Sequence, residues 1–490
     1  MSKKLAGVVA LAGMCALSLL LLNCGSSSDR PSGVLYVLTQ GSNGYGNNIS
    51  SFTLDYNNGE LSLVNSDAST CPTAASVTDP QPCGLPLNIL LDPAGATAFV
   101  LNQGAPPCPT CSPASNNPLA PSIYPFTVNS DGSLSNPGTA VTWSCPTANQ
   151  SPCNYSDTAV AMTRDATGQF LFVIDYGTYP TPGYPNPTPY PSCPHVPTKP
   201  DDVCPSISVF AMNSGSAGKT TLTLAPGSPF YLSNIPSALS SIIFTPPGSS
   251  TPQELLFVTN NQDICTANCV LPPHSDNTVS VYSVSSSGAL SETLYSPYVV
   301  AAVNPISVQA VYTNLTGENA GGLFLYVGNQ DANGGHLYPF EVCTVLSDFC
   351  TAAQVSEDFV SPLATCPQPS CDIQPTAAGS NPIAMVVDPT NNFLYVVSEV
   401  SSQVFEFRIN LGAGTLTPLN PASQPTGSQP VSMTMHPSVY VDGSYTGQFL
   451  YTSNIGAGNI TGWTLSTTTG AMSNGVTEVA PAAPGALTAH

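Results

Sequence analysis

A single acidic side chain, Glu399, stands where it could do chemistry. It follows the mostly apolar segment LYVVS (394–398), in a chain where only 7% of the 490 residues are charged. An average globular protein has about 25% charged residues, so an acid at the end of an apolar strand needs a physical reason. A carboxylate there could act as a general base toward water, or it could be a polar residue at a turn.

The elements that must position Glu399 are repeated along the chain, and such repeats decide the architecture of a protein. The first half of its segment recurs as LYV, AFV, LFV, LFV, LYV, LYV and LYT, beginning at residues 35, 98, 171, 256, 325, 394 and 450. A second pattern alternates with it, as ISSF, IYPF, ISVF, VSVY, LYPF, VFEF and ITGW, beginning at residues 49, 123, 207, 279, 337, 404 and 460. Glu399 therefore belongs to the sixth of seven units.

Each unit predicts four short β-strands, which we name A to D in chain order. The two patterns above are strands B and C, while a strand ending in a turn precedes most copies and a Gly-x-Leu strand follows many. Units three and five lack a clean strand D and have TTLTLA and EVCTVL there. Four-stranded units repeated radially form a β-propeller. The prediction is an all-β, seven-bladed propeller of antiparallel blades over residues 34–490, closed by a C-terminal strand at 484–490 that serves as strand A of the first blade.

Strand direction alternates within a blade, so the B–C loops and D–A crossovers share one face, which we call the top face. The A–B and C–D turns share the opposite, bottom face. The long segments are B–C loops and D–A crossovers, which predicts a functional top face, because binding residues usually lie on loops held by a rigid scaffold. The B–C loop 176–206 is rich in proline, and its tyrosines could contact a sugar or peptide or could cover the loop's own backbone. These are Tyr176, Tyr179, Tyr184 and Tyr190.

Fourteen of the 16 cysteines lie beyond the N-terminal segment and form close neighbours along the chain. An even number in an exported protein predicts disulfides, and local pairing is the simplest scheme. Metal binding at CPTC (108–111) is the alternative, but a zinc site needs four ligands and no second CxxC exists, so no metal is expected. The predicted pairs are Cys71 with Cys83, Cys108 with Cys111, Cys145 with Cys153, Cys193 with Cys204, Cys265 with Cys269, Cys343 with Cys350, and Cys366 with Cys371.

Residues 1–23 have the composition of an export signal peptide, with two lysines and then an apolar run from Leu5 to Leu22. The segment LLNC resembles a bacterial lipobox, which implies lipidation of Cys24, although Asn23 replaces the usual small residue. An uncleaved membrane anchor is the alternative, since the run is nearly long enough to span a bilayer. Residues 24–33 suit a flexible tether. We therefore predict an exported lipoprotein of the cell envelope, periplasmic or on the outer surface.

The charge balance excludes nucleic acid as a partner. The chain has 7 Lys and Arg against 28 Asp and Glu, whereas nucleic-acid binding needs clustered cations. Membrane contact is expected through the lipid anchor only. No cofactor is expected, because the sequence has no phosphate-binding glycine loop. It also has no serine-nucleophile elbow. We expect a monomer.

Residues 381–419, NPIAMVVDPTNNFLYVVSEVSSQVFEFRINLGAGTLTPL, resemble the seven-bladed lactonase propellers, the family that includes 6-phosphogluconolactonase. The segment LLFVTNN is also similar to YVTN-type surface propellers. As a repeat pattern the resemblance covers residues 34–490. It implies that Glu399 corresponds to the functional acid of the family's YVxNE segment, with Ser398 in place of the Asn.

The same resemblance implies His and Arg at the starts of inner strands, where this sequence reads SDTAVAM and SNPIAMV and offers neither. His336, expected in the B–C loop of the fifth blade, is the candidate catalytic partner of Glu399. Arg164 and Arg408 are expected at the bottom face. Only Lys199, in a loop, could then serve as a cationic clamp, so a phosphorylated substrate is disfavoured. We predict a propeller that binds a neutral glycan, a peptide or another partner on its disulfide-stapled top face, with its catalytic residues mostly lost. The alternative is an enzyme that hydrolyses a non-phosphorylated lactone.

Overall fold

The structure is a computed structural model, and its regular structure is entirely β-strand wherever the chain is described. None of the described segments contains a helix long and apolar enough to cross a membrane. The described residues are 33–40, 48–70, 85–103, 121–135, 138–142, 159–176, 205–215, 219–232, 234–246, 249–263, 277–294, 296–300, 304–313, 322–331, 334–343, 360–362, 376–436, 440–441, 444–445, 448–480 and 483–490.

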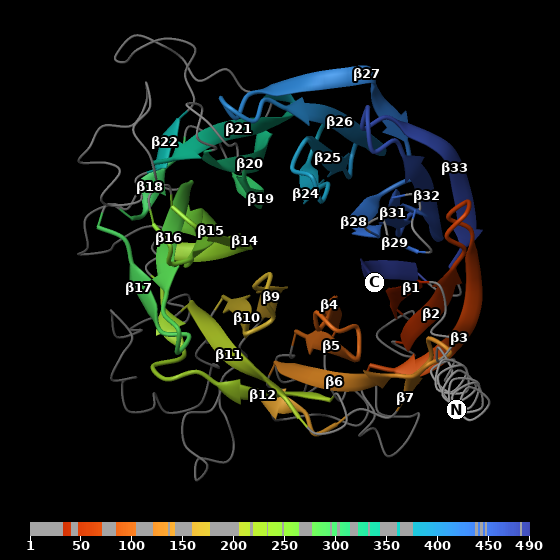
Figure 1. Ribbon diagram of the computed structural model, residues 1–490, viewed down its shortest axis with the longest axis horizontal. Coiled ribbons are helices and arrows are strands. Elements are labelled where there is room, and N and C mark those ends of the chain that lie inside the picture. Colours follow the sequence, from red (N-terminus) through yellow and green to blue (C-terminus); the bar gives the residue numbers. More distant parts are fainter. Residues whose placement is uncertain are drawn as a thin grey trace, which may run out of the picture.

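Seven antiparallel sheets stand around a central axis as the blades of a propeller (Figure 1), which confirms the predicted fold. Strand A of each blade lies nearest the axis and strand D lies at the outer edge of the disc. The A to D strands of the first three blades are β34 (Ala483–Ala489), β1 (Val34–Gln40), β2 (Asn48–Leu54) and β3 (Leu61–Ser69); β4 (Pro86–Leu91), β5 (Thr97–Asn102), β6 (Ser122–Val128) and β7 (Leu134–Ser135); β9 (Ala159–Arg164), β10 (Phe170–Asp175), β11 (Ser206–Ser214) and β12 (Thr220–Leu224).

The remaining blades follow the same order. Their A to D strands are β14 (Asn234–Phe244), β15 (Gln253–Asp263), β16 (Thr278–Val284) and β17 (Leu290–Glu292); β19 (Pro305–Tyr312), β20 (Leu323–Asp331), β21 (Gly334–Val342) and β22 (Val360–Pro362); β24 (Pro382–Val387), β25 (Phe393–Ser398), β26 (Gln403–Ile409) and β27 (Leu416–Pro425); β28 (Pro430–His436), β31 (Gln448–Asn454), β32 (Asn459–Leu465) and β33 (Met472–Val479). A small hairpin, β29 (Tyr440–Val441) with β30 (Ser444–Tyr445), lies in the last A–B connection.

Two features of the blades differ from the sequence prediction. Four blades gain a fifth, two-residue strand from the D–A crossover, which pairs with strand C: β8 (Val141–Thr142), β13 (Phe230–Tyr231), β18 (Tyr298–Val299) and β23 (Thr376–Ala377). The segment EVCTVL was expected as strand D of blade five, but Glu341 and Val342 end strand C, and the true strand D is β22. The prediction failed because β22 has no Gly-x-Leu pattern and is far from strand C in the chain.

The C-terminal strand closes the ring as predicted. β34 pairs antiparallel with β1, with Leu35 opposite Ala489 and Val37 opposite Leu487. The pairing is extended by a reciprocal pair of backbone hydrogen bonds between Val34 and His490, each 3.0 Å long. The pairing of β34 with β1 gives the first blade its strand A and joins the last strand of the chain to the first.

Adjacent blades are held together by the aromatic residue of the strand B pattern. In four blades this residue is a buried tyrosine whose hydroxyl donates to the carbonyl of the C–D turn glycine in the next blade. The pairs are Tyr36 to Gly132 (2.9 Å), Tyr326 to Gly414 (2.8 Å), Tyr395 to Gly470 (2.6 Å) and Tyr451 to Gly59 (2.9 Å). The last pair joins blade seven to blade one, so the strand B tyrosine also links the two blades where the ring closes.

Glycine is required at these turns for two reasons. Gly470 has a φ of 74°, in the left-handed region, and a Cβ atom on it would lie 2.2 Å from the ring of Phe393 in the preceding blade. Gly59 is similar, with a φ of 77° and a Cβ position 2.5 Å from the ring of Phe449. The Gly-x-Leu pattern therefore marks where one blade packs on the next.

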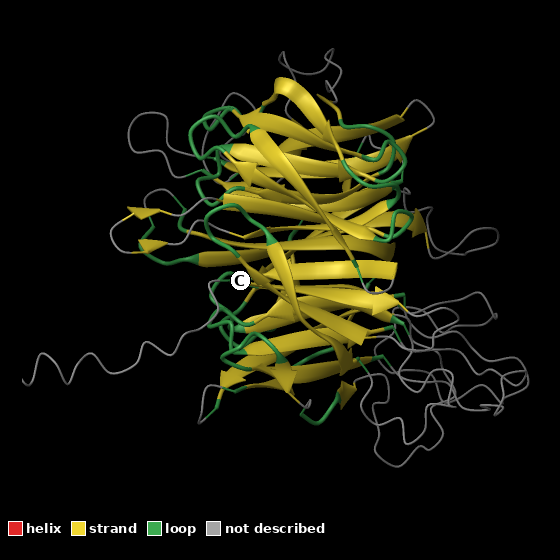
Figure 2. Cartoon of the chain, turned by 90° about the vertical axis from the view of Figure 1, so that its right-hand side faces the viewer, coloured by secondary structure: helices red, strands yellow, loops and turns green. Residues whose placement is uncertain are grey.

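The strands run between the two faces of the disc, as the side view in Figure 2 shows. At the bottom face, aspartates cap A–B turns: Asp92 accepts from the backbone N–H of Ala96 (2.7 Å), and Asp388 from that of Phe393 (2.7 Å). The B–C connections, including the one after Glu399, lie at the opposite end of the strands.

Candidate functional site

Glu399 occupies a position that recurs in every blade, the fifth residue after the start of the strand B pattern. We call these seven residues the rim positions. Where this hydrogen bond is described, the backbone N–H of the rim residue donates to the backbone carbonyl of the residue just before strand A. Examples are Glu399 to Asn381 (3.0 Å) and Ile455 to Gln429 (3.0 Å). The rim positions therefore lie at the top face beside the innermost strands. They are Gln40, Gln103, Tyr176, Asn261, Gln330, Glu399 and Ile455.

The residue before each rim position is polar and buried, and its role is structural. Asn260 donates to the hydroxyls of Thr278 and Ser280, both at 3.0 Å. Asn454 donates to Asn459 at 2.8 Å. These side chains join the end of strand B to the start of strand C, so they fix the direction in which the rim residue leaves the sheet.

The carboxylate of Glu399 is half-buried and accepts a hydrogen bond from the side-chain amide of Asn381. Asn381 has a φ of 66°, a left-handed conformation that asparagine tolerates better than most residues. The neighbouring backbone is held as well, since the Ser380 N–H donates to the Ser401 hydroxyl (2.8 Å). Glu399 is therefore built into the turn that connects the crossover to blade six.

Blade five has the same arrangement without the charge. Gln330 stands at its rim position, and its N–H donates to the carbonyl of Asn304 (3.1 Å). The side-chain amide of Asn304, with a φ of 53°, donates to Oε1 of Gln330 (3.1 Å). A neutral amide can thus fill the place that Glu399 fills in blade six.

His336 lies within strand C of blade five and not in a B–C loop, so that part of the prediction was wrong. Only residues 332 and 333 separate β20 from β21, and His336 pairs with Asn329 on one side and Ala377 on the other. The backbone N–H of His336 donates to Oδ1 of Asn329 (3.1 Å). Glu399 directly follows strand B of blade six. The two predicted catalytic residues therefore belong to neighbouring blades, and His336 lies one strand further from the axis.

The described arginines lie far from the rim positions along their strands. Arg164 ends β9 at the bottom face. Arg408, near the C–D turn of blade six, places its guanidinium carbon 4.8 Å from the centre of the Phe393 ring. Among the described residues, no group of three His, Cys, Asp or Glu side chains could hold a metal ion.

Two acids with raised pKa values were not predicted from the sequence: Glu406, which is buried, and Glu254, which is half-buried. Burial raises the pKa of Glu406 to about 7, although the Met472 N–H that donates to it (2.9 Å) opposes the shift. Burial, and then the charge of Asp165, raises the pKa of Glu254 to about 8. A signal existed for Glu406, since it is the one charged residue at the third place of the seven strand C patterns.

Most of the other predicted site residues lie outside the described part of the chain. Tyr176 is described as a half-buried residue at the rim position of blade three, and Cys343 is disulfide-bonded. Its predicted partner Cys350 is not among the described residues, so the pairing stays a prediction. The same holds for Cys24, for the three loop tyrosines and for the remaining cysteines: Tyr179, Tyr184, Tyr190, Cys71, Cys83, Cys108, Cys111, Cys145, Cys153, Cys193, Cys204, Cys265, Cys269, Cys366 and Cys371.

Comparison with known proteins supports the same architecture. Residues 368–486 match the family model "Lactonase, 7-bladed beta-propeller". A candidate 6-phosphogluconolactonase from Bacteroides fragilis has a similar structure, with a TM-score of 0.51 and 15% identity over 95% of this chain and 99% of that one. The periplasmic gluconolactonase of Pseudomonas aeruginosa gives a TM-score of 0.52 and 13% identity over 93% and 98% of the two chains. No curated protein sequence matches significantly. The chain therefore has the fold of a lactonase-type seven-bladed propeller, as its repeats and its strand B pattern had indicated.

Proposed function

We propose that this chain is an exported, lipid-anchored propeller whose top face binds an uncharged, hydroxyl-rich ligand of the sugar or sugar-lactone class. The observation that carries the proposal is the composition of the seven rim positions. Glu399 is the one formally charged residue among them, and its carboxylate is hydrogen-bonded to the amide of Asn381. Amide and hydroxyl groups at the rim can donate to and accept from neutral hydroxyls without needing a charge on the ligand.

Two further observations favour a non-phosphorylated ligand. A phosphate group calls for Arg or Lys in close contact, but Arg164 and Arg408 are placed toward the bottom face. The net formal charge of −21 also opposes the approach of an anion. Of the two ligand types in the names of the similar structures, the unphosphorylated gluconolactone fits this rim better.

Hydrolysis of such a lactone is the second candidate function. It is favoured because Glu399 falls inside the segment that matches the lactonase family model and stands at the place of the family's functional acid. Glu399 would act as the base for water. The Asn381 amide holds the carboxylate in place, and a donor for the developing oxyanion would have to come from another top-face group.

The two candidates are separated by assays on the full-length protein and two variants. Glu399→Gln removes the acid, and Gln330→Glu is the matched control that places an acid in the equivalent turn of blade five. The panel contains unphosphorylated sugar lactones, their phosphorylated counterparts, and the stable parent sugars as binding probes. Binding of neutral sugars without turnover supports the leading proposal.

Turnover that is lost in Glu399→Gln and kept in Gln330→Glu establishes the hydrolase instead. If neutral sugars and lactones neither bind nor react, while a phosphorylated compound does, both forms of the proposal are wrong. Intact-mass measurement of the exported protein without reduction tests the remaining parts: we expect a lipidated Cys24 and seven local disulfides. An unmodified Cys24 or free thiols would contradict them.

A further inference from the structure

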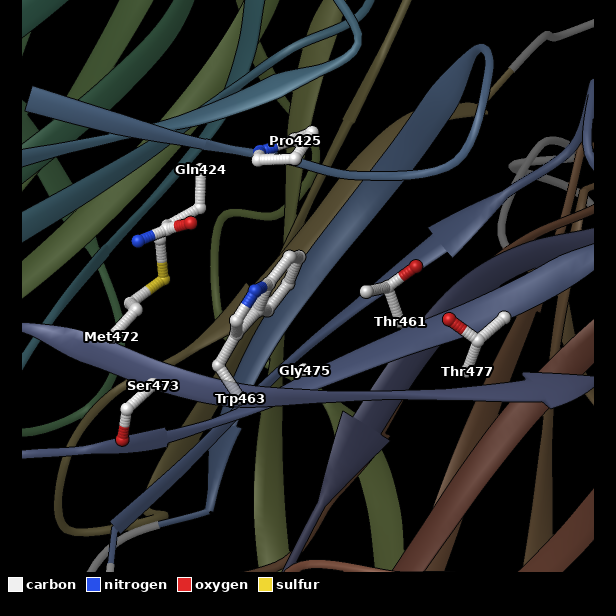
Figure 3. A pocket seen from close by; sticks show the side chains of 8 residues that line it. All are labelled: Gln424, Pro425, Thr461, Trp463, Met472, Ser473, Gly475 and Thr477. Carbon is white, nitrogen blue, oxygen red and sulfur yellow. The ribbon is translucent and has the colours of Figure 1, made fainter. Parts of the chain in front are cut away.

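A recess lies on the outer wall of the propeller, between the outer strands of blades six and seven. This groove has a volume of about 350 Å³. One side comes from the end of β27, with Gln424 and Pro425, and the other from β32 and β33 of the next blade (Figure 3). The indole of Trp463 stands in the middle of the lining, with Thr461 and Thr477 beyond it in this view. The groove does not involve the rim positions of the top face.

Local irregularities in both outer strands shape this groove. Between Gly462 and Thr464 the pairing of β32 with β33 shifts register, so that Trp463 itself has no direct partner on β33. In blade six the register of β26 and β27 shifts between Phe405 and Phe407. Bulges of this kind bend a strand and re-aim its side chains. Here they allow the end of β27 and the start of β33 to stand apart around the indole.

The floor of the groove is held rigidly from below. Met472, which lines it, donates its N–H to the buried carboxylate of Glu406 (2.9 Å). Trp463 is only 4% exposed, and it packs with Met472, Tyr395 and Leu450 in the core between the two blades. The indole therefore has one fixed orientation and presents only its outer part to the groove.

The lining combines uncharged hydrogen-bonding groups with a few apolar surfaces. The side chains of Gln424, Thr461, Ser473 and Thr477 supply an amide and three hydroxyls, and Trp463, Met472 and Pro425 supply apolar contact. None of the lining residues is charged. A volume of about 350 Å³ lies at the small end of ligand pockets, roughly 300 to 1,000 Å³.

We propose that this groove is a binding site for one neutral sugar residue, free or at the end of a glycan. A pyranose ring offers apolar C–H faces and several hydroxyls that both donate and accept, which is the mixture that the indole, the amide and the three hydroxyls complement. A purely apolar ligand would offer no partner to the Gln424 amide or the Thr477 hydroxyl, and an anion would meet no cation in the lining. This inference rests on different residues from the proposed function and stands or falls independently of it.

Gly475 provides a way to close the groove without touching the core. It is exposed on β33, and a Cβ atom there would lie 3.4 Å from Nε1 of Trp463, an ordinary contact distance. In Gly475→Leu the added side chain should occupy the space beside the indole. Thr417→Leu, at an exposed position of β27 outside the groove, is the matched control for an added surface leucine.

The experiment uses the full-length protein carrying Trp143→Phe, so that Trp463 is the remaining tryptophan. Its emission is titrated with the methyl glycosides of glucose, galactose and mannose, and saturation-transfer NMR reports binding independently. We expect at least one glycoside to bind and to shift the emission, with at least a tenfold loss of affinity in Gly475→Leu and no loss in Thr417→Leu. If no glycoside binds by either method, or if binding is unchanged in the folded Gly475→Leu protein, the proposal is wrong.

Discussion

Blades five and six are built from the same parts but differ in where they place acids. In each, a left-handed asparagine precedes strand A, its amide binds the rim residue, and a strand B tyrosine donates to the next blade's turn glycine. Blade five has Gln330 at the rim and Pro339 at the third place of strand C, whereas blade six has Glu399 and Glu406. The shared contacts form the scaffold of both blades. The two acids of blade six, Glu399 and Glu406, are not needed for those contacts and must have another cause.

Glu399 has a neutral counterpart in Gln330 of blade five. Because Gln330 makes the same contacts, the Asn–rim hydrogen bond does not by itself require a charge at Glu399. Any requirement for the acid must then come from a ligand or a reaction at the top face. Glu406 is different, since it is buried between blades six and seven where its neighbours are mainly apolar.

The largest effect on stability is expected at Tyr326 and Tyr395, which occupy equivalent positions in the two blades. Tyr326→Ala and Tyr395→Ala should each lower the free energy of unfolding by about 3–5 kcal/mol, because each leaves a cavity between two blades and an unpaired turn carbonyl. Chemical denaturation followed by circular dichroism would measure both. If only one variant is destabilised, the two blade contacts are not equivalent.

Glu406, the buried acid of blade six, should make the stability of the protein depend on pH. Burial raises the pKa of Glu406 from 4.5 to about 7, so the folded protein holds this proton more tightly than the unfolded chain. The contribution of Glu406 to the free energy of unfolding therefore falls as the pH rises from about 4.5 to about 7 and levels off above that. The total loss is about 3 kcal/mol, at 1.36 kcal/mol per pKa unit.

Glu406→Gln should remove this part of the pH dependence. Thermal or chemical unfolding at pH 5 and pH 8 would compare the variant with the wild type. A dependence of the same sign should persist in both proteins, because burial also raises the pKa of Glu254, to about 8. Equal pH dependence in the two proteins would show that Glu406 is solvated.

Removing only the tyrosine hydroxyls should have a smaller effect. Tyr326→Phe and Tyr395→Phe keep the ring packing and lose one hydrogen bond each, which is worth about 1 kcal/mol. Denaturation midpoints measured beside those of the alanine variants would separate packing from hydrogen bonding. A loss as large as that of the alanine variants would mean that the ring does not stay in place without its hydroxyl.

The smallest effect is expected at the rim. Glu399→Gln should change the free energy of unfolding by less than about 0.5 kcal/mol, since the amide can accept from Asn381 as Gln330 accepts from Asn304. The same denaturation assay measures it, with Gln330→Glu as the reciprocal exchange. A strong destabilisation by Glu399→Gln would make the charge structural and break the equivalence of the two turns.

Regular features of this fold could be predicted because each is encoded within a few residues. The alternation of LYV-type and VFEF-type patterns defines strands B and C, and the aromatic and glycine residues of these patterns make the blade-to-blade contacts. Strand D of blade five could not be predicted, since β22 is short and is held by its pairing with β21. The placement of His336 in a loop failed for a related reason, because the length of a hairpin depends on where two strands stop pairing.

By itself, the sequence determined seven blades, ring closure by the last strand, and the position of Glu399 at the top end of blade six. Those properties follow from the period of two along each strand and from repetition along the chain. Only the tertiary structure decided that Asn381 binds Glu399, that Glu406 is buried between two blades, and that Trp463 faces a groove. Each of these depends on residues from different strands or blades meeting in space, and a local pattern carries no information about its distant neighbours.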